Sequence, residues 1–202
     1  MADLNYKDKY QKEIIPKLKE SLGYKNNFAV PRVEKVVLSV GLGKLSQQTN
    51  FQEKILPEVI KNISEITGQK PKTTVAKKSI AGFKVREGQI IGVKVTLRGA
   101  RMHDFIKKLV MSVFPRVRDF RGIDIGVVDK QGNLSVGFKE NVVFPEINAE
   151  ISQIEFGVEV TLVTKARKRE EAIELYKLLG MPFKEKGEEV VKKKRKSKSK
   201  KI

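Results

Sequence analysis

Within the segment from Ile90 to Arg98, hydrophobic and polar residues alternate strictly from Val93 onward. In an extended chain, a period of two places successive residues on opposite sides. One side of this segment carries Val93, Val95 and Leu97, and the other carries Lys94, Thr96 and Arg98. The segment therefore predicts a strand that buries its apolar side in a core and turns a row of cations and hydroxyls toward solvent.

The same alternation, bounded by turn-forming residues, predicts the other strands of a sheet. They are expected at Val33–Leu42, near Thr73, at Ile123–Val128, at Leu134–Lys139 and at Glu155–Thr164. The third and fourth of these are expected to be joined across the turn-rich residues 129–133. The polar sides of these strands carry mostly small or hydroxyl-bearing residues: Ser39, Gly41, Ser135, Gly137, Lys139 and Thr161.

Apolar residues that recur every three or four positions predict four helices. The helices are expected at residues 3–22, 50–67, 101–114 and 168–179. Asp3 and either Thr49 or Asn50 are candidate caps for the first two. Pro16 predicts a kink or a division in the first helix, and Pro115 predicts the end of the third.

Helices mixed with one-sided strands are typical of an α+β fold. We expect an antiparallel sheet with helices packed on one face, and an opposite face that is open and polar. Residues 1–184 are expected to form a single domain. Residues 185–202 are charged and poor in aromatic residues, so this basic tail is expected to be disordered when free.

The charge of the chain is strongly positive, with 42 Lys and Arg residues against 24 Asp and Glu residues and a net charge of +18. The last eleven residues supply eight positive charges, so the rest of the chain retains about +10. Such an excess indicates a polyanionic partner, with nucleic acid ahead of an anionic membrane surface. The absence of cysteine excludes disulfides, thiolate metal sites and thiol nucleophiles.

Two parts of the sequence concentrate the positive charge. Residues 70–101 hold nine Lys or Arg residues and one acid, Glu87. Within them, Ala76 to Gly88 is too polar to bury and is expected to form a loop, called here the basic loop, with a hairpin around Glu87-Gly88. Just past the third predicted helix lies a second basic cluster of Arg116, Arg118 and Arg121.

Residues suited to catalysis are scarce. The one histidine, His103, has no second histidine or cysteine to pair with, so an exposed or capping role is favoured over that of a general base. Gly41-Leu42-Gly43 resembles the start of a dinucleotide-binding fingerprint but lacks the third glycine, and a tight turn explains it better. We therefore expect no enzyme activity, no cofactor and no metal; a phosphate-handling enzyme built on Gly41 and Gly43 is the weaker alternative.

Four motifs resemble those of one family, the bacterial form of large-subunit ribosomal protein L-five. They are VPRVEKVVLSVGLG from Val30, ITGQKPKTTVAKKSIAGFKVREGQIIGVKVTLRG from Ile66, FPRVRDFRG from Phe114 and VVFPEI from Val142. The resemblance runs to about Lys184, and the tail beyond it has no counterpart in the family pattern. It implies a non-enzymatic protein that binds 5S rRNA in the central protuberance, touches the P-site tRNA and bridges to protein S-thirteen of the small subunit.

The resemblance also assigns residues to these contacts. The row of the family that contacts 5S rRNA falls on Ser39, Gln69 and Thr96, where Ser39 replaces an asparagine, and we expect Lys35, Lys94 and Arg98 to add cations beside them. The tRNA contact falls on the basic loop, at Lys77, Lys78, Ser79, Lys84 and Arg86. The second basic cluster is expected to serve either the bridge or rRNA.

A general DNA-binding or chromatin-like protein is the alternative that the tail and the overall charge support. For the tail itself, a nonspecific RNA clamp, a nuclear-import-like signal and a solubilising end remain open. The start of the chain has no apolar signal region, and no apolar run is long enough to span a bilayer. The protein is therefore expected to be cytoplasmic, and the resemblance implies that it is bound to the ribosome.

Overall fold

The structure is a computed structural model that describes residues 6–148, 152 and 154–184. Its strands are β1 Val33–Gly41, β2 Lys72–Val75, β3 Ile90–Leu97, β4 Leu134–Phe138 and β5 Val158–Thr164. Its α-helices are α1 Tyr6–Lys9, α2 Ile15–Leu22, α3 Leu56–Thr67, α4 Gly99–Lys108, α5 Phe114–Arg116 and α6 Arg169–Leu178. The candidate cap Asp3 and the tail 185–202 lie outside the described residues.

The five strands form one antiparallel sheet in the order β2-β3-β1-β5-β4, with β1 at its centre. Strand β1 pairs with β3 and β5, and β2 and β4 form the two edges. The apolar side of β1 is almost fully buried: Val36, Leu38 and Val40 are at most 3% exposed. This confirms the alternation predicted for the central strands.

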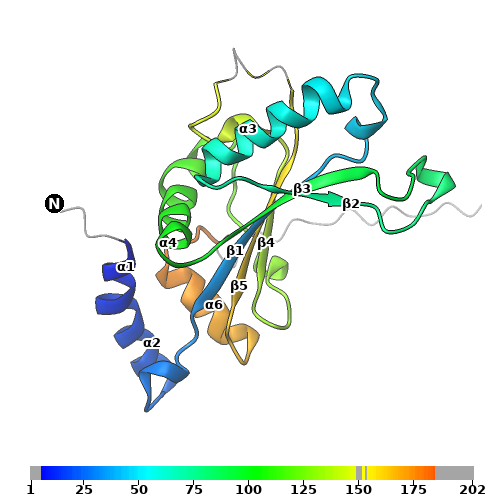
Figure 1. Ribbon diagram of the computed structural model, residues 1–202. Helices are drawn as coiled ribbons and strands as arrows, with labels where there is room; N and C mark the ends of the chain where they lie inside the picture. Colours follow the sequence, from blue (N-terminus) through cyan, green and yellow to red (C-terminus); the bar gives the residue numbers. More distant parts are fainter. Residues whose placement is uncertain (1–5, 149–151, 153, 185–202) are drawn as a thin grey trace, which may run out of the picture.

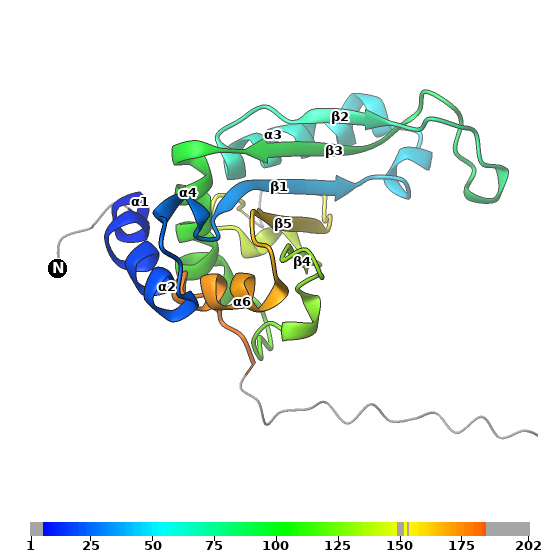
Figure 2. The same ribbon diagram turned by 90° about the horizontal axis from the view of Figure 1, so that it is seen from below.

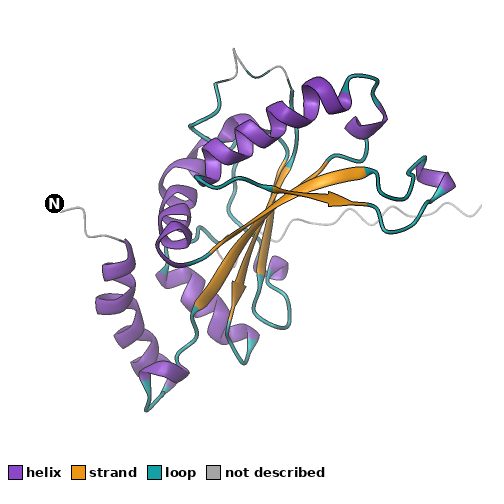
Figure 3. Ribbon diagram, viewed as in Figure 1, coloured by secondary structure: helices purple, strands orange, loops and turns teal. Residues whose placement is uncertain are grey.

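Helices cover only one face of the sheet, as Figure 3 shows from the side and Figure 2 from below. Helix α3 buries Val59, Ile63 and Ile66, and helix α4 buries Phe105 and Ile106 in the same core. The opposite face of the sheet carries no helix among the described residues, and we call it the open face (Figure 1). The α+β class, the antiparallel sheet and the one-sided helix layer are therefore confirmed.

Three helices contain a π-helical turn that ends two residues before a proline. These turns are Tyr10–Ile14 before Pro16, Phe51–Ile55 before Pro57, and Leu109–Val113 before Pro115. Proline has no N–H to donate and its ring crowds the carbonyl four residues earlier, which a wider turn relieves. Pro16 thus interrupts the regular α-helix without ending the helical run, which continues through α2 to Leu22, and Pro115 is followed by one more helical residue, Arg116.

Two expectations about chain geometry are wrong. Ile123–Val128 is not a strand; Ile125–Val127 forms a 3₁₀ turn because the Asp124 carboxylate accepts a hydrogen bond from the Gly126 N–H at 2.7 Å. The edge strand β4 therefore pairs along its length with β5 and meets that segment only in a single antiparallel bridge between Leu134 and Val128. Asn50 precedes the second helix, but its side chain makes no capping hydrogen bond.

The basic loop extends the β2–β3 hairpin beyond the end of the sheet (Figures 1 and 2). It contains its own antiparallel bridge between Ile80 and Val85, with a 3₁₀ turn Ala81–Phe83 at its tip. Side chains hold its base: Gln89 Nε2 donates to Ser46 Oγ at 3.1 Å, and Gln89 Oε1 accepts from the Arg86 N–H at 2.9 Å. The loop is thus a projection with its own tip, and the turn predicted at Glu87-Gly88 lies where it returns to β3: the Gln89 N–H donates to the Arg86 carbonyl oxygen at 3.2 Å.

Helix α6 is locked to the sheet through the connection before β4. The buried Tyr176 hydroxyl lies 2.9 Å from the Gly132 carbonyl oxygen and 3.1 Å from that of Leu162. Gly132 has a φ of 83°, and a Cβ there would lie 2.7 Å from Ala172 Cβ. Only glycine fits this position without displacing helix α6.

We expect Gly132→Ala to lower the free energy of unfolding by roughly 2–4 kcal/mol, because it adds both backbone strain and overpacking. Urea denaturation measures this change. Gly43→Ala is the matched control, since a Cβ at Gly43 would meet nothing within 4 Å. Equal stabilities of the two variants would contradict the packing described for Gly132.

We expect Gln89→Ala to speed trypsin cleavage at Lys84 and Arg86 by roughly 3- to 10-fold, because about 1 kcal/mol of hydrogen bonding at the loop base is lost. Limited proteolysis followed by mass spectrometry measures the rate. Gln48→Ala, an exposed glutamine on the neighbouring turn, should leave it unchanged. Identical rates for Gln89→Ala and the unaltered protein would show that Gln89 does not hold the loop.

Candidate nucleic-acid interface

The strand register places polar side chains of the open face in rows that cross the sheet. The longest row takes one residue from each strand: Lys72, Lys94, Ser39, Glu159 and Gly137. The next row holds Thr96, Val37, Thr161 and Ser135. Strand alternation thus brings cations, hydroxyls and bare backbone to one surface.

Two lysines stand directly opposite each other on adjacent strands. Lys72 pairs with Lys94 across β2 and β3, and both are exposed. Like charges in this position repel and destabilise the sheet. An anion bound over the pair would offset that repulsion, so this edge of the open face is suited to phosphate.

The two candidate hydroxyls lie diagonally across the β1–β3 pair. Ser39 is opposite Lys94, while Thr96 is opposite Val37, two pairs further along. Both are half-buried and turned toward the open face. Gln69 does not join them on a strand, because it lies three residues before the first paired residue of β2, beyond helix α3.

The candidate cations near the end of the sheet are placed differently from one another. Lys35 is half-buried opposite Val163, whereas Arg98 is exposed just past β3. An ion pair of 3.5 Å joins Arg98 Nη1 to Glu34 Oε1. Exposed pairs of this kind contribute about 0–1 kcal/mol, so Arg98 can exchange Glu34 for a phosphate at little cost.

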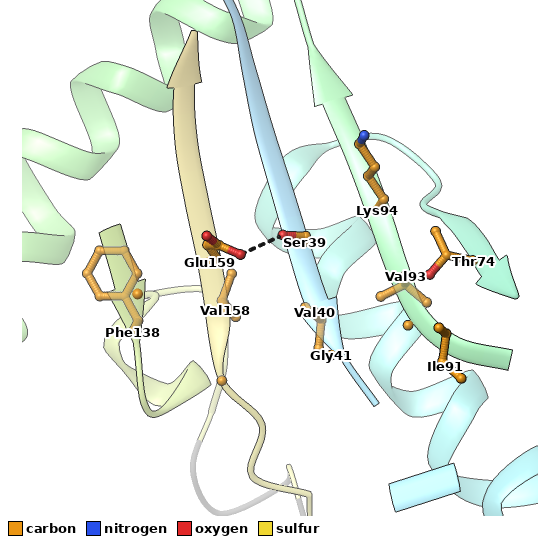
Figure 4. A pocket seen from close by; sticks show the side chains of 13 residues that line it. Ser39, Val40, Gly41, Thr74, Ile91, Val93, Lys94, Phe138, Val158 and Glu159 are labelled. Atoms are coloured by element: carbon orange, nitrogen blue, oxygen red, sulfur yellow. Dashed lines mark hydrogen bonds between the residues drawn. The ribbon is translucent and has the colours of Figure 1, made fainter. Parts of the chain in front are cut away.

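An acid that the sequence reasoning passed over lies on the open face on β5, beside the central strand β1. Glu159 accepts a hydrogen bond from Ser39 Oγ at 3.3 Å (Figure 4). Its position follows from the same alternation that places Thr161, two residues later, on this face. The open face is therefore cationic toward β2 and acidic at β5, and not uniformly basic.

The basic loop presents its charged and apolar residues to solvent together. Lys77, Lys78, Ser79, Lys84 and Arg86 are all exposed. Phe83 at the tip is 70% exposed and Ile80 is 50% exposed. The loop therefore offers a contact surface that is separate from the rows of the open face.

The second basic cluster lies on the side of the sheet that the helices cover. Phe114 packs with its ring centroid 5.9 Å from that of Phe138, which belongs to the buried side of β4. Arg116, Arg118 and Arg121 follow it along the chain, and all three are exposed. The structure therefore separates this cluster from the open face.

Within the described part of the chain, the residues offer no catalytic or metal-binding arrangement. His103 lies against Tyr10, with ring centroids 5.5 Å apart, and is not part of a cluster of possible metal ligands. Gly41 belongs to β1 and lies opposite Gly92, so Gly41-Leu42-Gly43 forms the end of an antiparallel strand. No helix in the described residues is long and apolar enough to cross a membrane.

Two family models match consecutive parts of the chain. The model described as "Ribosomal protein L5" matches residues 26–86, and a second model, for the C-terminus of the same ribosomal protein family, matches residues 90–183. The first range contains β1 and β2 and the second contains β3, β4 and β5. Strands from both ranges alternate in a single sheet.

Curated relatives match most of the chain over nearly their whole length, and those named here are each called "Large ribosomal subunit protein uL5". The protein of Halothermothrix orenii is 50% identical over 176 residues, 87% of this chain and 96% of the relative. That of Carboxydothermus hydrogenoformans is 50% identical over 88% of this chain and 97% of the relative. That of Thermotoga maritima is 48% identical over 88% of this chain and 95% of the relative.

The family models and the relatives agree with the four motifs and with the antiparallel sheet. Together they confirm the expectation that the chain has a structural role and is not an enzyme. The chain belongs to the ribosomal protein L5 family, the L-five family of the large ribosomal subunit.

Proposed function

We propose that this ribosomal protein binds 5S rRNA with its open face and helps to anchor that RNA in the central protuberance. The observation that carries the proposal is the register of the sheet, which gathers Ser39, Thr96 and the Lys72–Lys94 pair on one helix-free surface. Folded RNA is recognised largely through its shape, phosphates and 2′-hydroxyls. A surface of hydroxyls, cations and bare backbone suits that mode of binding.

The cations and the hydroxyls have different tasks in this proposal. Lys35, Lys94 and Arg98, with Lys72 at the edge, release counterions as they meet phosphates, which supplies affinity. Ser39, Gln69 and Thr96 fix the register of the RNA through directional hydrogen bonds. No aromatic residue lies in the two rows described above, so base stacking is not part of the mechanism.

The basic loop and the second basic cluster are proposed to serve other partners. The loop projects beyond the end of the sheet, which suits a contact with the P-site tRNA through Lys77, Lys78, Ser79, Lys84 and Arg86. Arg116, Arg118 and Arg121, on the helix-covered side, are proposed to contact either rRNA or protein S-thirteen in a bridge to the small subunit. One chain would then touch three partners through three separate surfaces.

We expect the affinity for 5S rRNA to fall steeply with salt. If four to six phosphates are contacted, the slope of log affinity against log salt should be roughly −3 to −5. Filter binding across a series of KCl concentrations measures it, with duplex DNA of equal length as competitor. A flat dependence, or equal competition by the DNA, would contradict specific binding of 5S rRNA.

We expect Thr96→Ala to weaken 5S rRNA binding by roughly 3- to 10-fold, because one hydrogen bond contributes about 0.5–1.5 kcal/mol. The double variant Lys77→Ala/Lys78→Ala should spare that binding and weaken P-site tRNA binding by ribosomes that carry the variant. The two variants serve as controls for each other. Equal losses in both assays for both variants would show that the open face and the basic loop do not have separate roles.

A further inference from the structure

A shallow hollow of about 410 Å³ crosses the strands near one end of the sheet, where β1 and β4 end and β3 and β5 begin (Figure 4). Ser39, Lys94 and Glu159 border it, and Thr74 lies on its β2 side. Four glycines, one from each of β1, β3 and β4 and one just before β5, account for its depth: Gly41, Gly92, Gly137 and Gly157. The hollow exists because side chains are missing where the strands would otherwise carry them.

The fold requires only some of these glycines. A Cβ on Gly92 would lie 2.6 Å from the Val40 carbonyl oxygen, so packing explains that residue. A Cβ on Gly41 or Gly137 would meet nothing within 4 Å, and neither has a positive φ. Because glycine weakens a strand, its presence at these two positions points to the close approach of another molecule.

Glu159 determines which part of a nucleic acid can approach the hollow. Its carboxylate accepts hydrogen bonds and repels phosphate, and it already accepts one from Ser39. Lys94 lies two strands away, a separation of about 10 Å at the usual strand spacing. A bound strand therefore meets a cation toward β2 and an acceptor on β5.

We propose that the hollow receives the ribose edge of an RNA strand, with a 2′-hydroxyl donating to Glu159 while neighbouring phosphates lie over Lys94 and Lys72. This inference rests on the proposed binding of RNA by the open face. The wide, shallow minor groove of an RNA helix displays its 2′-hydroxyls, and the 2′-hydroxyl distinguishes RNA from DNA. Glu159 is then a residue that determines specificity, and Gly41 and Gly137 let the ribose come close.

The test uses a bacterial 5S rRNA transcript carrying sparse 2′-deoxy substitutions. Bound and unbound RNA are separated and sequenced, which shows where loss of a 2′-hydroxyl weakens binding. With the unaltered protein, 2′-deoxy substitution at a small group of nucleotides should weaken binding, which is called interference here. With Glu159→Ala, affinity should fall roughly tenfold and at least one of those nucleotides should cease to interfere, because the hydrogen bond to a charged acceptor is already lost.

Glu159→Gln provides a conservative comparison, because its amide oxygen still accepts a hydrogen bond. It should retain the interference signal that Glu159→Ala loses. Unchanged interference maps for Glu159→Ala would overturn the inference while leaving the proposed function intact. Failure of the unaltered protein to bind the transcript would overturn both.

The glycines are tested by the double variant Gly41→Ala/Gly137→Ala, compared with Gly82→Ala. Gly82 lies in the basic loop, and a Cβ there also meets nothing within 4 Å. The double variant should bind the 5S transcript several-fold more weakly while unfolding at the same or a higher urea concentration, and Gly82→Ala should bind normally. Lower stability of the double variant, or unchanged RNA binding, would overturn the role given to the two glycines.

Discussion

The structure depends on the central position of strand β1, which is hydrogen-bonded along both edges while its two sides meet different surroundings. Its apolar side is buried under helices α3 and α4, and its polar side is left open. Because a shift of one residue would exchange the two sides, burial of Val36, Leu38 and Val40 fixes the register of the neighbouring strands. That register is what aligns Lys94, Ser39 and Glu159 across the sheet.

The sheet and its one-sided helix layer spread the charged residues over several surfaces. The net positive charge of the chain therefore does not give the charge of any single surface. The open face has lysines opposite each other at β2 and β3 and a carboxylate on β5. The basic loop and the second basic cluster place their cations beyond the sheet and on its helix-covered side. A partner bound to the open face therefore meets both positive and negative charges. This pattern favours one position of the partner, whereas a uniformly positive surface would only attract it.

Alternation predicted the sheet and its open face well, because burial on one side leaves a clear period of two in β1, β3 and β5. It failed for Ile123–Val128, where the capping bond from Gly126 to Asp124 favours a turn. The π-helical turns could not be predicted from periodicity, since proline signals a break without showing how the helix accommodates it. The position of Glu159 on the open face was predictable from the same alternation as that of Thr161, but a search for cations does not select an acid. No local pattern could show that Gln69 lies off the strands.

The central claim is that the open face, and not the helix-covered side, is the main surface for 5S rRNA. Ultraviolet cross-linking of the purified chain to a 5S rRNA transcript, followed by mass spectrometry of the cross-linked peptides, tests it most directly. The account expects cross-linked nucleotides on the peptides of β1, β3 and β5 that carry Ser39, Thr96 and Glu159. Cross-links confined to helices α3, α4 and α6 would contradict it.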